Sequence, residues 1–175
     1  ANTHGGNVSY IMDLLDEFED FKKNDGFGIK FQPFKYDLIA TNDYEWFKTY
    51  KELFINEDES EKILDKAFIT KDVWIDIFDL YGIKIIQKNL KKIYGLKLQT
   101  SILENQEVFK ALKNHDISKL KLIINIAGRD KTEIKYLISR YEELNIQELL
   151  IEVGFQAYPT KLEDSGLSKI KFLKD

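Results

Sequence analysis

The sequence predicts an α/β fold built on a parallel sheet, and three observations support this prediction. Stretches rich in branched and aromatic residues begin near residues 28, 73, 96, 121 and 149, and helical patterns separate them. The last four stretches recur at intervals of about 25 residues, which is typical of strand–helix units in a parallel sheet. No glycine-rich phosphate loop follows a strand, which favours a barrel over a dinucleotide-binding fold. We therefore expect an incomplete (β/α)8 barrel of the TIM-barrel type, with about five to six strand–helix units in one domain over residues 1–175.

Local signals justify each element in the first half of the chain. Asn7 is a good N-cap, and apolar residues at helical spacing follow it. Pro33 closes the first strand, because proline cannot donate a hydrogen bond to a sheet. Acidic residues open the third helix, where they suit the helix dipole. The elements expected here are a helix over 7–21, a strand over 28–32, helices over 44–54 and from 56 onward, and a strand over 73–79.

The second half alternates strands and helices more regularly. Gly95 is expected to end a helix as its C-cap. The continuous apolar run at 121–128 is typical of a strand that is covered on both faces in a parallel sheet. The elements expected here are helices over 81–93, 107–113, 132–144 and 162–173, and strands over 95–99, 121–128 and 148–155.

The composition is that of an ordinary globular protein. Hydrophobic residues make up 43% of the chain and charged residues 32%, which argues against a disordered chain. The net charge is −4, with acids and lysines intermixed, so no basic stripe for nucleic acid is expected. No apolar stretch reaches the ~18 residues of a membrane span, and we expect no leader at the start of the chain. Cysteine is absent, which excludes disulfides and thiolate metal sites. We expect a cytoplasmic protein with neither nucleic acid nor membrane as a partner.

Two lysines occupy matching places in two strands. Lys30 stands in the run Gly-Ile-Lys-Phe-Gln, which we expect to be buried, and Lys97 stands in the run Gly-Leu-Lys-Leu-Gln. An ammonium among apolar side chains is costly unless an anion or a polar group meets it. Because lysine binds phosphate as a point charge, the pair suggests a phosphorylated or carboxylated small molecule as the ligand. The alternative is that one or both lysines extend along the rim to water.

Further polar residues stand at the expected carboxyl ends of the strands, where barrel enzymes place their chemistry. Asp76 and Asp79 are candidate acids, bases or metal ligands, although acids at strand ends also cap helices. His4, in a glycine-flanked loop, is expected at the same mouth. No catalytic residue and no metal ligand is assigned from this chain. The expected substrate-binding residues are Lys30, Gln32, Asp76, Lys97, Thr100, Asn125, Gln156 and Tyr158.

Taken together, these residues resemble the catalytic barrel of the sialic acid synthase family (N-acetylneuraminate synthase and its bacterial relatives). Six motifs carry the resemblance in order through nearly the whole chain. Residues 3–6 resemble the family's Asn-His-x-Gly loop, 29–32 its Lys-Phe-Gln strand, 78–79 its Pro-Phe-Asp, 96–100 its Tyr-Lys-Ile-x-Ser, 125–128 its Leu-Ser-Thr-Gly, and 158–160 its Tyr-Pro-Thr turn.

The resemblance implies an activity. Members of the family condense phosphoenolpyruvate with a phosphorylated or free N-acylated hexosamine to form a nonulosonic acid. Lys30 and Lys97 would hold the phosphate and carboxylate of phosphoenolpyruvate, and Thr100 would donate a hydroxyl hydrogen bond to the same ligand. Gln156 and Tyr158 would line the sugar side. The resemblance also implies a divalent metal, manganese or magnesium, that polarises the sugar aldehyde. Its histidine ligands would lie on strands beyond residue 175, and the full-length protein would be a homodimer.

Departures from the family pattern leave other functions open. Gly5 stands where a loop carboxylate often follows the histidine, and Ala127 stands in a strand end that has lost its hydroxyls. Asp76 places a negative charge that would repel a substrate anion unless a lysine or a metal neutralises it. The first hypothesis is a synthase-like transferase that forms a carbon–carbon bond in carbohydrate biosynthesis. The alternative is a catalytically degenerate barrel that binds a sugar acid or serves in oligomerisation. A third option is an aldolase that uses Lys30 or Lys97 as a Schiff-base nucleophile.

Overall fold

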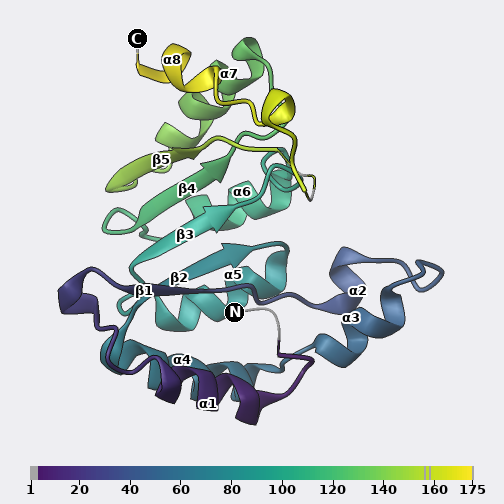
Figure 1. Cartoon of the computed structure of the whole chain (residues 1–175), viewed down its shortest axis with the longest axis vertical. Coiled ribbons are helices and arrows are strands. Elements are labelled where there is room, and N and C mark those ends of the chain that lie inside the picture. The colour runs from purple at the N-terminus through teal and green to yellow at the C-terminus, as the bar shows by residue number, and fades with distance from the viewer. Residues whose placement is uncertain (1–3, 156, 158, 175) are drawn as a thin grey trace.

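The computed structural model describes residues 4–155, 157 and 159–174, and a five-stranded parallel sheet forms its centre (Figure 1). The strands lie in sequence order, and each pairs in parallel with the next. Every strand begins at the residue expected from the sequence or one residue before it, which confirms the α/β prediction. The strands are β1 (Gly28–Phe31), β2 (Asp72–Ile77), β3 (Gly95–Leu98), β4 (Lys121–Asn125) and β5 (Glu148–Glu152).

The sheet is open and does not close into a barrel. Within the described residues, β1 and β5 form its two edges. The strand order is compatible with part of a barrel wall, but a TIM-barrel architecture is not confirmed. The expectation that the Lys30 strand is buried is wrong for most of its length, because β1 is an edge strand. Gly28 is exposed, Ile29 and Lys30 are half-buried, and only Phe31 is buried.

Helices connect the strands and cover one side of the sheet (Figure 1). Asn56 and Asp130 each begin a helix with a capping box, in which side chain and backbone exchange hydrogen bonds. A short arm that contains α2 and α3 projects away from the sheet (Figure 1). The helices are α1 (Val8–Glu17), α2 (Tyr36–Ile39), α3 (Phe47–Leu53), α4 (Glu57–Thr70), α5 (Leu80–Asn89), α6 (Gln106–Lys113), α7 (Lys131–Glu142) and α8 (Lys169–Lys174), with 3-10 turns η1 (Lys23–Asp25) and η2 (Leu162–Asp164).

The two faces of the sheet differ sharply in polarity. Side chains alternate between the faces of a strand, so every second residue shares a face. The face toward the helices is apolar, and Ile75, Leu96 and Leu122 on it are fully buried. The opposite face, here called the inner face, carries Asp76 beside Lys97, its register partner on β3. The interior of a closed barrel is normally packed with branched apolar side chains. Polar residues on the inner face therefore mark a candidate site.

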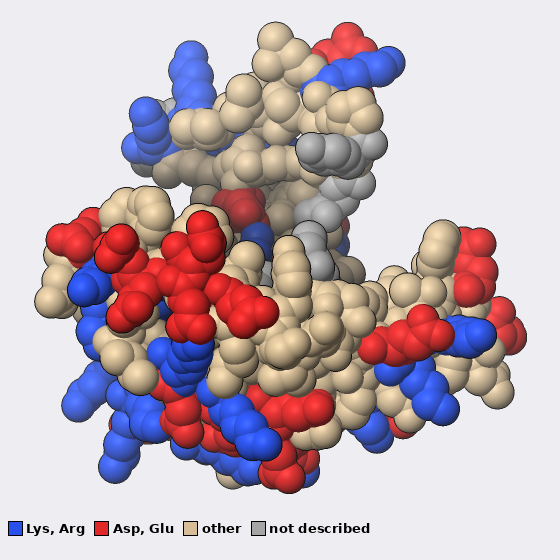
Figure 2. Space-filling view, turned by 60° about the horizontal axis from the view of Figure 1, so that its bottom comes forward, with Lys and Arg blue, Asp and Glu red and all other residues tan. Residues whose placement is uncertain are grey.

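Charges of both signs cover the outer surface. In the view of Figure 2, lysines and acids are interspersed over the helices, and no continuous basic stripe crosses this face. None of the helices in the described ranges has the length and apolar character needed to cross a membrane.

Gly95 gives a first test of the packing on the inner face. It was expected to cap a helix, but α5 ends at Asn89 and Gly95 begins β3. The ring of its register partner Trp74 covers it, and a Cβ at Gly95 would overlap several ring atoms. Gly95→Ala is therefore expected to lower the free energy of unfolding by about 1–3 kcal/mol in urea titrations. Gly154→Ala, where a Cβ would meet no atom within 4 Å, is the control. Equal urea midpoints for the two variants would contradict this packing.

Candidate functional site

A buried carboxylate organises the inner face at the carboxyl ends of β1, β2 and β3. Lys30 Nζ lies 2.9 Å from Asp76 Oδ2. Gln32 and Gln99 donate side-chain N–H groups to the same oxygen, at 3.1 and 3.0 Å. The Asp76 side chain is 0% exposed, and three donors hold one of its oxygens. The lysine therefore neutralises the negative charge that departs from the family pattern.

The second oxygen of this carboxylate has a different environment. Asp76 Oδ1 is buried and has no hydrogen-bond donor among the described residues. A buried acceptor without a donor costs about 1–3 kcal/mol relative to a satisfied one. Asp76 Oδ1, at the centre of the inner face, can therefore accept one more hydrogen bond.

The second lysine is also paired. Lys97 Nζ lies 2.9 Å from Glu152 Oε1 and 2.6 Å from Oε2. The Lys97 side chain is 8% exposed, whereas that of Glu152 is 40% exposed and ends the edge strand β5. The two lysines do gather on one site, as expected, but each faces a carboxylate of the protein. The formal charges of Lys30, Asp76, Lys97 and Glu152 cancel, so these four residues form a neutral ion-pair cluster.

The electrostatics of the cluster bear on the Schiff-base option. Burial lowers the pKa of Lys30, but the hydrogen bond to Asp76 and the charges of Asp76 and Glu152 raise it. The net result is a pKa above the ordinary value. A Schiff-base nucleophile needs a neutral amine, which a lowered pKa provides. The environment of Lys30 therefore opposes that role.

Asn125 and Thr100 extend the polar network beyond the ion pairs. Asn125 Nδ2 donates to Gln99 Oε1 at 3.3 Å, and its Oδ1 accepts from the Ala127 N–H at 2.9 Å. The Thr100 hydroxyl donates to the Ala127 carbonyl at 2.9 Å and accepts from Arg129 Nε at 3.3 Å. The hydroxyl proton of Thr100 is thus used within the protein. This differs from the expected role of Thr100 as a donor to the ligand.

Sequence reasoning missed Glu152 and Arg129. Glu152 had a usable signal, because Glu148 stands four residues earlier and therefore on the same face of β5. Glu148 likewise pairs across the sheet, with Lys121 at 3.0 Å. Arg129 follows a glycine in a loop, and no pattern singled it out.

Asp79 is a helix cap, as its alternative interpretation predicted. Its Oδ1 accepts a hydrogen bond from the Gly82 N–H at 3.0 Å, and Oδ2 accepts one from the Lys35 N–H at 2.7 Å. Burial raises the pKa of Asp79, the backbone hydrogen bonds oppose this shift, and the net pKa is raised. Asp79 therefore fixes α5 and the start of the arm.

A hollow of about 940 Å³ opens beside the ion-pair cluster. The arm, the segments that follow β1 and β2, and the loop after β3 line it. Gln32 lines the hollow and also bonds to Asp76, so the hollow and the cluster adjoin. Four aromatic residues contribute to its wall, namely Phe34, Tyr44, Tyr50 and Phe78.

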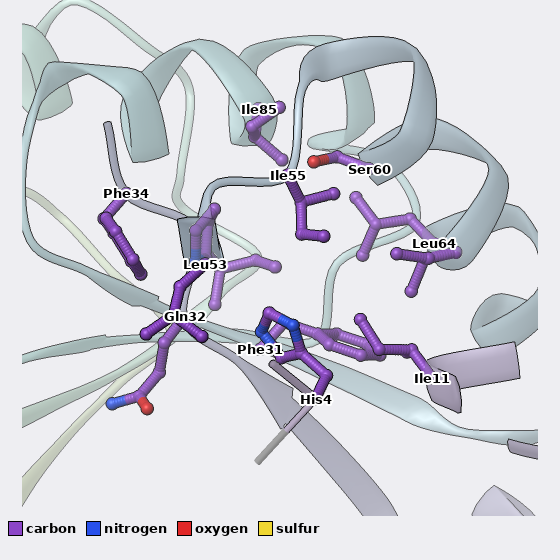
Figure 3. Close-up of a pocket in the computed structure, with 13 residues that line it drawn as sticks. His4, Ile11, Phe31, Gln32, Phe34, Leu53, Ile55, Ser60, Leu64 and Ile85 are labelled. Atoms are coloured by element: carbon purple, nitrogen blue, oxygen red, sulfur yellow. The ribbon is translucent and has the colours of Figure 1, made fainter. Parts of the chain in front are cut away.

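A smaller apolar cavity of about 50 Å³ lies next to the hollow and shares four lining residues with it, His4, Gln32, Phe34 and Leu53. Figure 3 shows the His4 ring beside Phe31, while the Gln32 amide points away from the apolar residues. His4 Nδ1 accepts a hydrogen bond from the Gly6 N–H at 3.0 Å. Burial lowers the pKa of His4. His4 thus lies at the mouth, as expected.

The remaining expectations concern residues and groups outside this network. Gln156 and Tyr158, expected on the sugar side, lie outside the described residues. Among the residues that the structure does describe, no group of three or more His, Cys, Asp or Glu side chains is arranged to hold a metal ion. The donor set needed for the divalent metal implied by the resemblance is therefore not found in that part of the chain.

No protein-family model matches the chain, and neither does any curated protein. Solved structures do match it. The sialic acid synthetase of Leptospira borgpetersenii serovar Hardjo-bovis, in complex with citrate, superposes with a TM-score of 0.80 at 20% identity, over 98% of this chain and 57% of that one. A putative spore coat polysaccharide biosynthesis protein E from Chromobacterium violaceum gives 0.79 at 18% identity, over 99% and 52%. A spore coat polysaccharide biosynthesis protein from Bacillus subtilis gives 0.70 at 17% identity, over 97% and 46%.

The chain spans about half the length of these proteins. At such identities the likeness shows the fold alone. It confirms, for the fold, the resemblance to the sialic acid synthase family that the six motifs predicted. The chain has the fold of about half of a sialic acid synthetase and of similar spore coat polysaccharide biosynthesis proteins.

Proposed function

We propose that the chain forms the substrate-binding edge of a sialic acid synthase-like enzyme of carbohydrate biosynthesis. The reaction would condense phosphoenolpyruvate with an N-acylated amino sugar to give a nonulosonic acid. The observation that carries this proposal is the approach of Lys30 and Lys97, from β1 and β3, to one polar site at the carboxyl edge of the sheet. The biosynthetic names of the similar solved proteins support it.

The two ion pairs differ in how readily a substrate anion can replace the protein carboxylate. Glu152 ends an edge strand and its side chain is 40% exposed, so its carboxylate can turn toward water when a substrate anion takes its place beside the buried Lys97. Asp76 is fully buried and holds three donors, so it remains beside Lys30. Lys97 is therefore the main anion contact in this proposal, and Lys30 mainly neutralises the negative charge of Asp76.

Calorimetric titration with phosphoenolpyruvate tests the anion site. Lys97→Ala is expected to weaken binding by about tenfold or more, a loss of at least ~1.4 kcal/mol, and Lys30→Ala by less. Lys121→Ala is the matched control, because Lys121 also pairs with a glutamate of β5 but lies at the amino ends of the strands. Equal affinities for all four proteins, or no binding by the wild type, would sink the proposal.

The proposal also includes features of a longer enzyme, which the resemblance to the sialic acid synthase family leads us to expect. A manganese or magnesium ion, a homodimer and a cytoplasmic location belong to the longer enzyme that the resemblance implies. The metal has no assigned role in this part of the chain, since the described residues do not supply its ligands. Phosphate release from phosphoenolpyruvate, measured with manganese and N-acetylated hexosamines, tests the enzymatic part.

Two observations favour a second candidate function, binding without catalysis. The charges of the ion-pair cluster cancel, and the Thr100 hydroxyl bonds within the protein. A degenerate barrel that binds a sugar acid or serves in oligomerisation would show both features. The similarity of the chain to biosynthetic proteins does not favour this alternative. Tight ligand binding without any phosphate release would support it.

A further inference from the structure

The hollow beside the ion-pair cluster has a pronounced charge bias. Three acidic residues, Asp37, Asp79 and Glu107, line it, and no lysine or arginine does so in the part of the chain that the structure describes. Lys35 pairs with Asp37 at 3.0 Å but is not part of the lining. His4 adds little positive charge at neutral pH, because its pKa is lowered, mainly by burial. The wall of the hollow is therefore acidic.

The aromatic part of the wall offers ring surface to a ligand. The rings of Tyr44 and Tyr50 lie 6.0 Å apart with an interplanar angle of 33°, and Phe34 meets Tyr50 edge-on at 5.9 Å. Tyr44 is 45% exposed, so part of its surface is accessible. Aromatic faces are electron-rich and attract cations, and they also pack well against C–H groups. Small-molecule sites commonly combine such walls with a few convergent polar groups.

The hollow also adjoins the place where a second substrate would react. Gln32 lines it and donates to Asp76, the centre of the ion-pair cluster. Ser101 lines the hollow as well and follows Lys97 by four residues on the loop after β3. A ring held in the hollow would therefore lie next to an anion held by the two lysines.

We infer that this hollow takes the amino sugar as an uncharged or cationic ring and rejects the sugar phosphate. The inference rests on the proposed function, because that function supplies the sugar as a substrate. A phosphate monoester carries about two negative charges near neutral pH and would meet acidic side chains, with no lysine or arginine in the wall formed by the described residues. The aromatic faces and the carboxylates instead suit an unphosphorylated ring with hydroxyl, amide or ammonium groups.

Ligand-observed NMR and calorimetry, without phosphoenolpyruvate, test this inference on the whole chain. The probes are hexosamines of gluco, manno and galacto configuration, each as the N-acetylated sugar, the free amine and the 6-phosphate. We expect at least one unphosphorylated form to bind at least about tenfold more tightly than its own 6-phosphate, because of charge repulsion. Binding of a 6-phosphate as tight as that of its unphosphorylated form would overturn the inference.

Variants of residues in the hollow test which side chains are responsible for sugar binding and for the rejection of the sugar phosphate. Tyr44→Ala is expected to weaken binding of the unphosphorylated sugar at least about fivefold through lost ring contact, whereas Tyr10→Ala, an equally exposed tyrosine on α1, should not. The double variant Asp37→Asn, Glu107→Gln should reduce the difference in binding affinity between the unphosphorylated sugar and its 6-phosphate. Glu142→Gln on α7 is its control.

The two proposals can fail separately. If no sugar binds in any form, or if Tyr44→Ala binds like the wild type, the inference about the hollow is wrong. Titration of the same samples with phosphoenolpyruvate then still reports on the lysine site. If phosphoenolpyruvate fails to bind while an unphosphorylated sugar binds in the hollow, the proposed condensation is wrong and the hollow stands as a sugar site.

Discussion

Asp76→Asn is expected to tighten phosphoenolpyruvate binding by about tenfold, or ~1.4 kcal/mol. The substitution removes one negative charge from the anion site and changes the side-chain shape very little. At an effective dielectric constant of about 20, a unit charge about 5 Å from the ligand contributes about 3 kcal/mol, and the nearby Lys30 reduces this. The amide oxygen can still accept from Lys30, Gln32 and Gln99, while the amide nitrogen takes the position of Oδ1, which has no donor among the described residues.

The fold should tolerate this change. The Lys30 side chain is 37% exposed, so water can solvate its ammonium. Asp72→Asn removes the same charge from the amino end of the same strand, β2, and is expected to leave the affinity nearly unchanged. Calorimetry on both variants checks the result. Weaker binding by Asp76→Asn would show that its carboxylate supports the anion site, contrary to the proposal.

Tyr141→Ala is expected to lower the free energy of unfolding by about 3–5 kcal/mol. Tyr141 is 0% exposed on α7, its ring meets Phe109 edge-on at 5.6 Å, and its hydroxyl donates to the Leu103 carbonyl at 2.9 Å. Truncation opens a cavity between α6 and α7 and leaves that carbonyl without its donor. Since the total free energy of unfolding of a small domain is only about 5–15 kcal/mol, this loss is a large share of the total stability. Urea unfolding measures it.

Two variants keep this prediction testable if Tyr141→Ala does not fold. Tyr141→Phe retains the ring and loses only the hydrogen bond, for an expected cost of about 1–2 kcal/mol. Tyr136→Ala removes a tyrosine that is 54% exposed on the same helix and should cost less than about 1 kcal/mol. A cost for Tyr136→Ala equal to that for Tyr141→Phe would contradict the assigned packing.

Ionisation of the Tyr141 side chain should also make the free energy of unfolding depend on pH. Burial raises the pKa of Tyr141 to about 12, whereas an unfolded chain ionises its tyrosines near pH ~10. The stability that comes from the neutral phenol is therefore complete below about pH 10 and is lost as the pH rises toward about 12. Tyr141→Phe lacks this contribution, so its free energy of unfolding should fall less steeply over that range.

The sheet could be predicted from the sequence because its signals are local. The stretch around Ile75 and the run around Ile123 are apolar over several consecutive residues, and each is followed by a helical pattern. The first residue of each strand could be located to within one position for this reason. Elements without such periodicity were missed or misread. Helix α2 is too short to show a helical repeat, and Gly166, at φ 70°, interrupts the long helix expected at the end of the chain.

The site could be predicted only in part. Lys30, Asp76 and Lys97 were found because each is a charge within an apolar run. Their partners could not be named, because the chain has 30 acidic residues and only the pairing of distant strands selects among them. Glu152 on β5 contacts Lys97 on β3 across the intervening strand β4, an arrangement that only the order of the strands in the sheet determines. The hollow was not anticipated for the same reason, since its wall combines the arm with loops after β2 and β3.

The contrast between the two faces of the sheet also has a consequence for how the chain finds its structure. Leu96 and Leu98 are fully buried against the helices, while Lys97 between them points to the polar side. If β3 aligned one residue out of step, both leucines would turn to the inner face and the lysine would enter the apolar layer. A misaligned sheet would therefore carry an uncompensated charge in its core. The charges that make the site also penalise misfolded alignments of the strands that carry them.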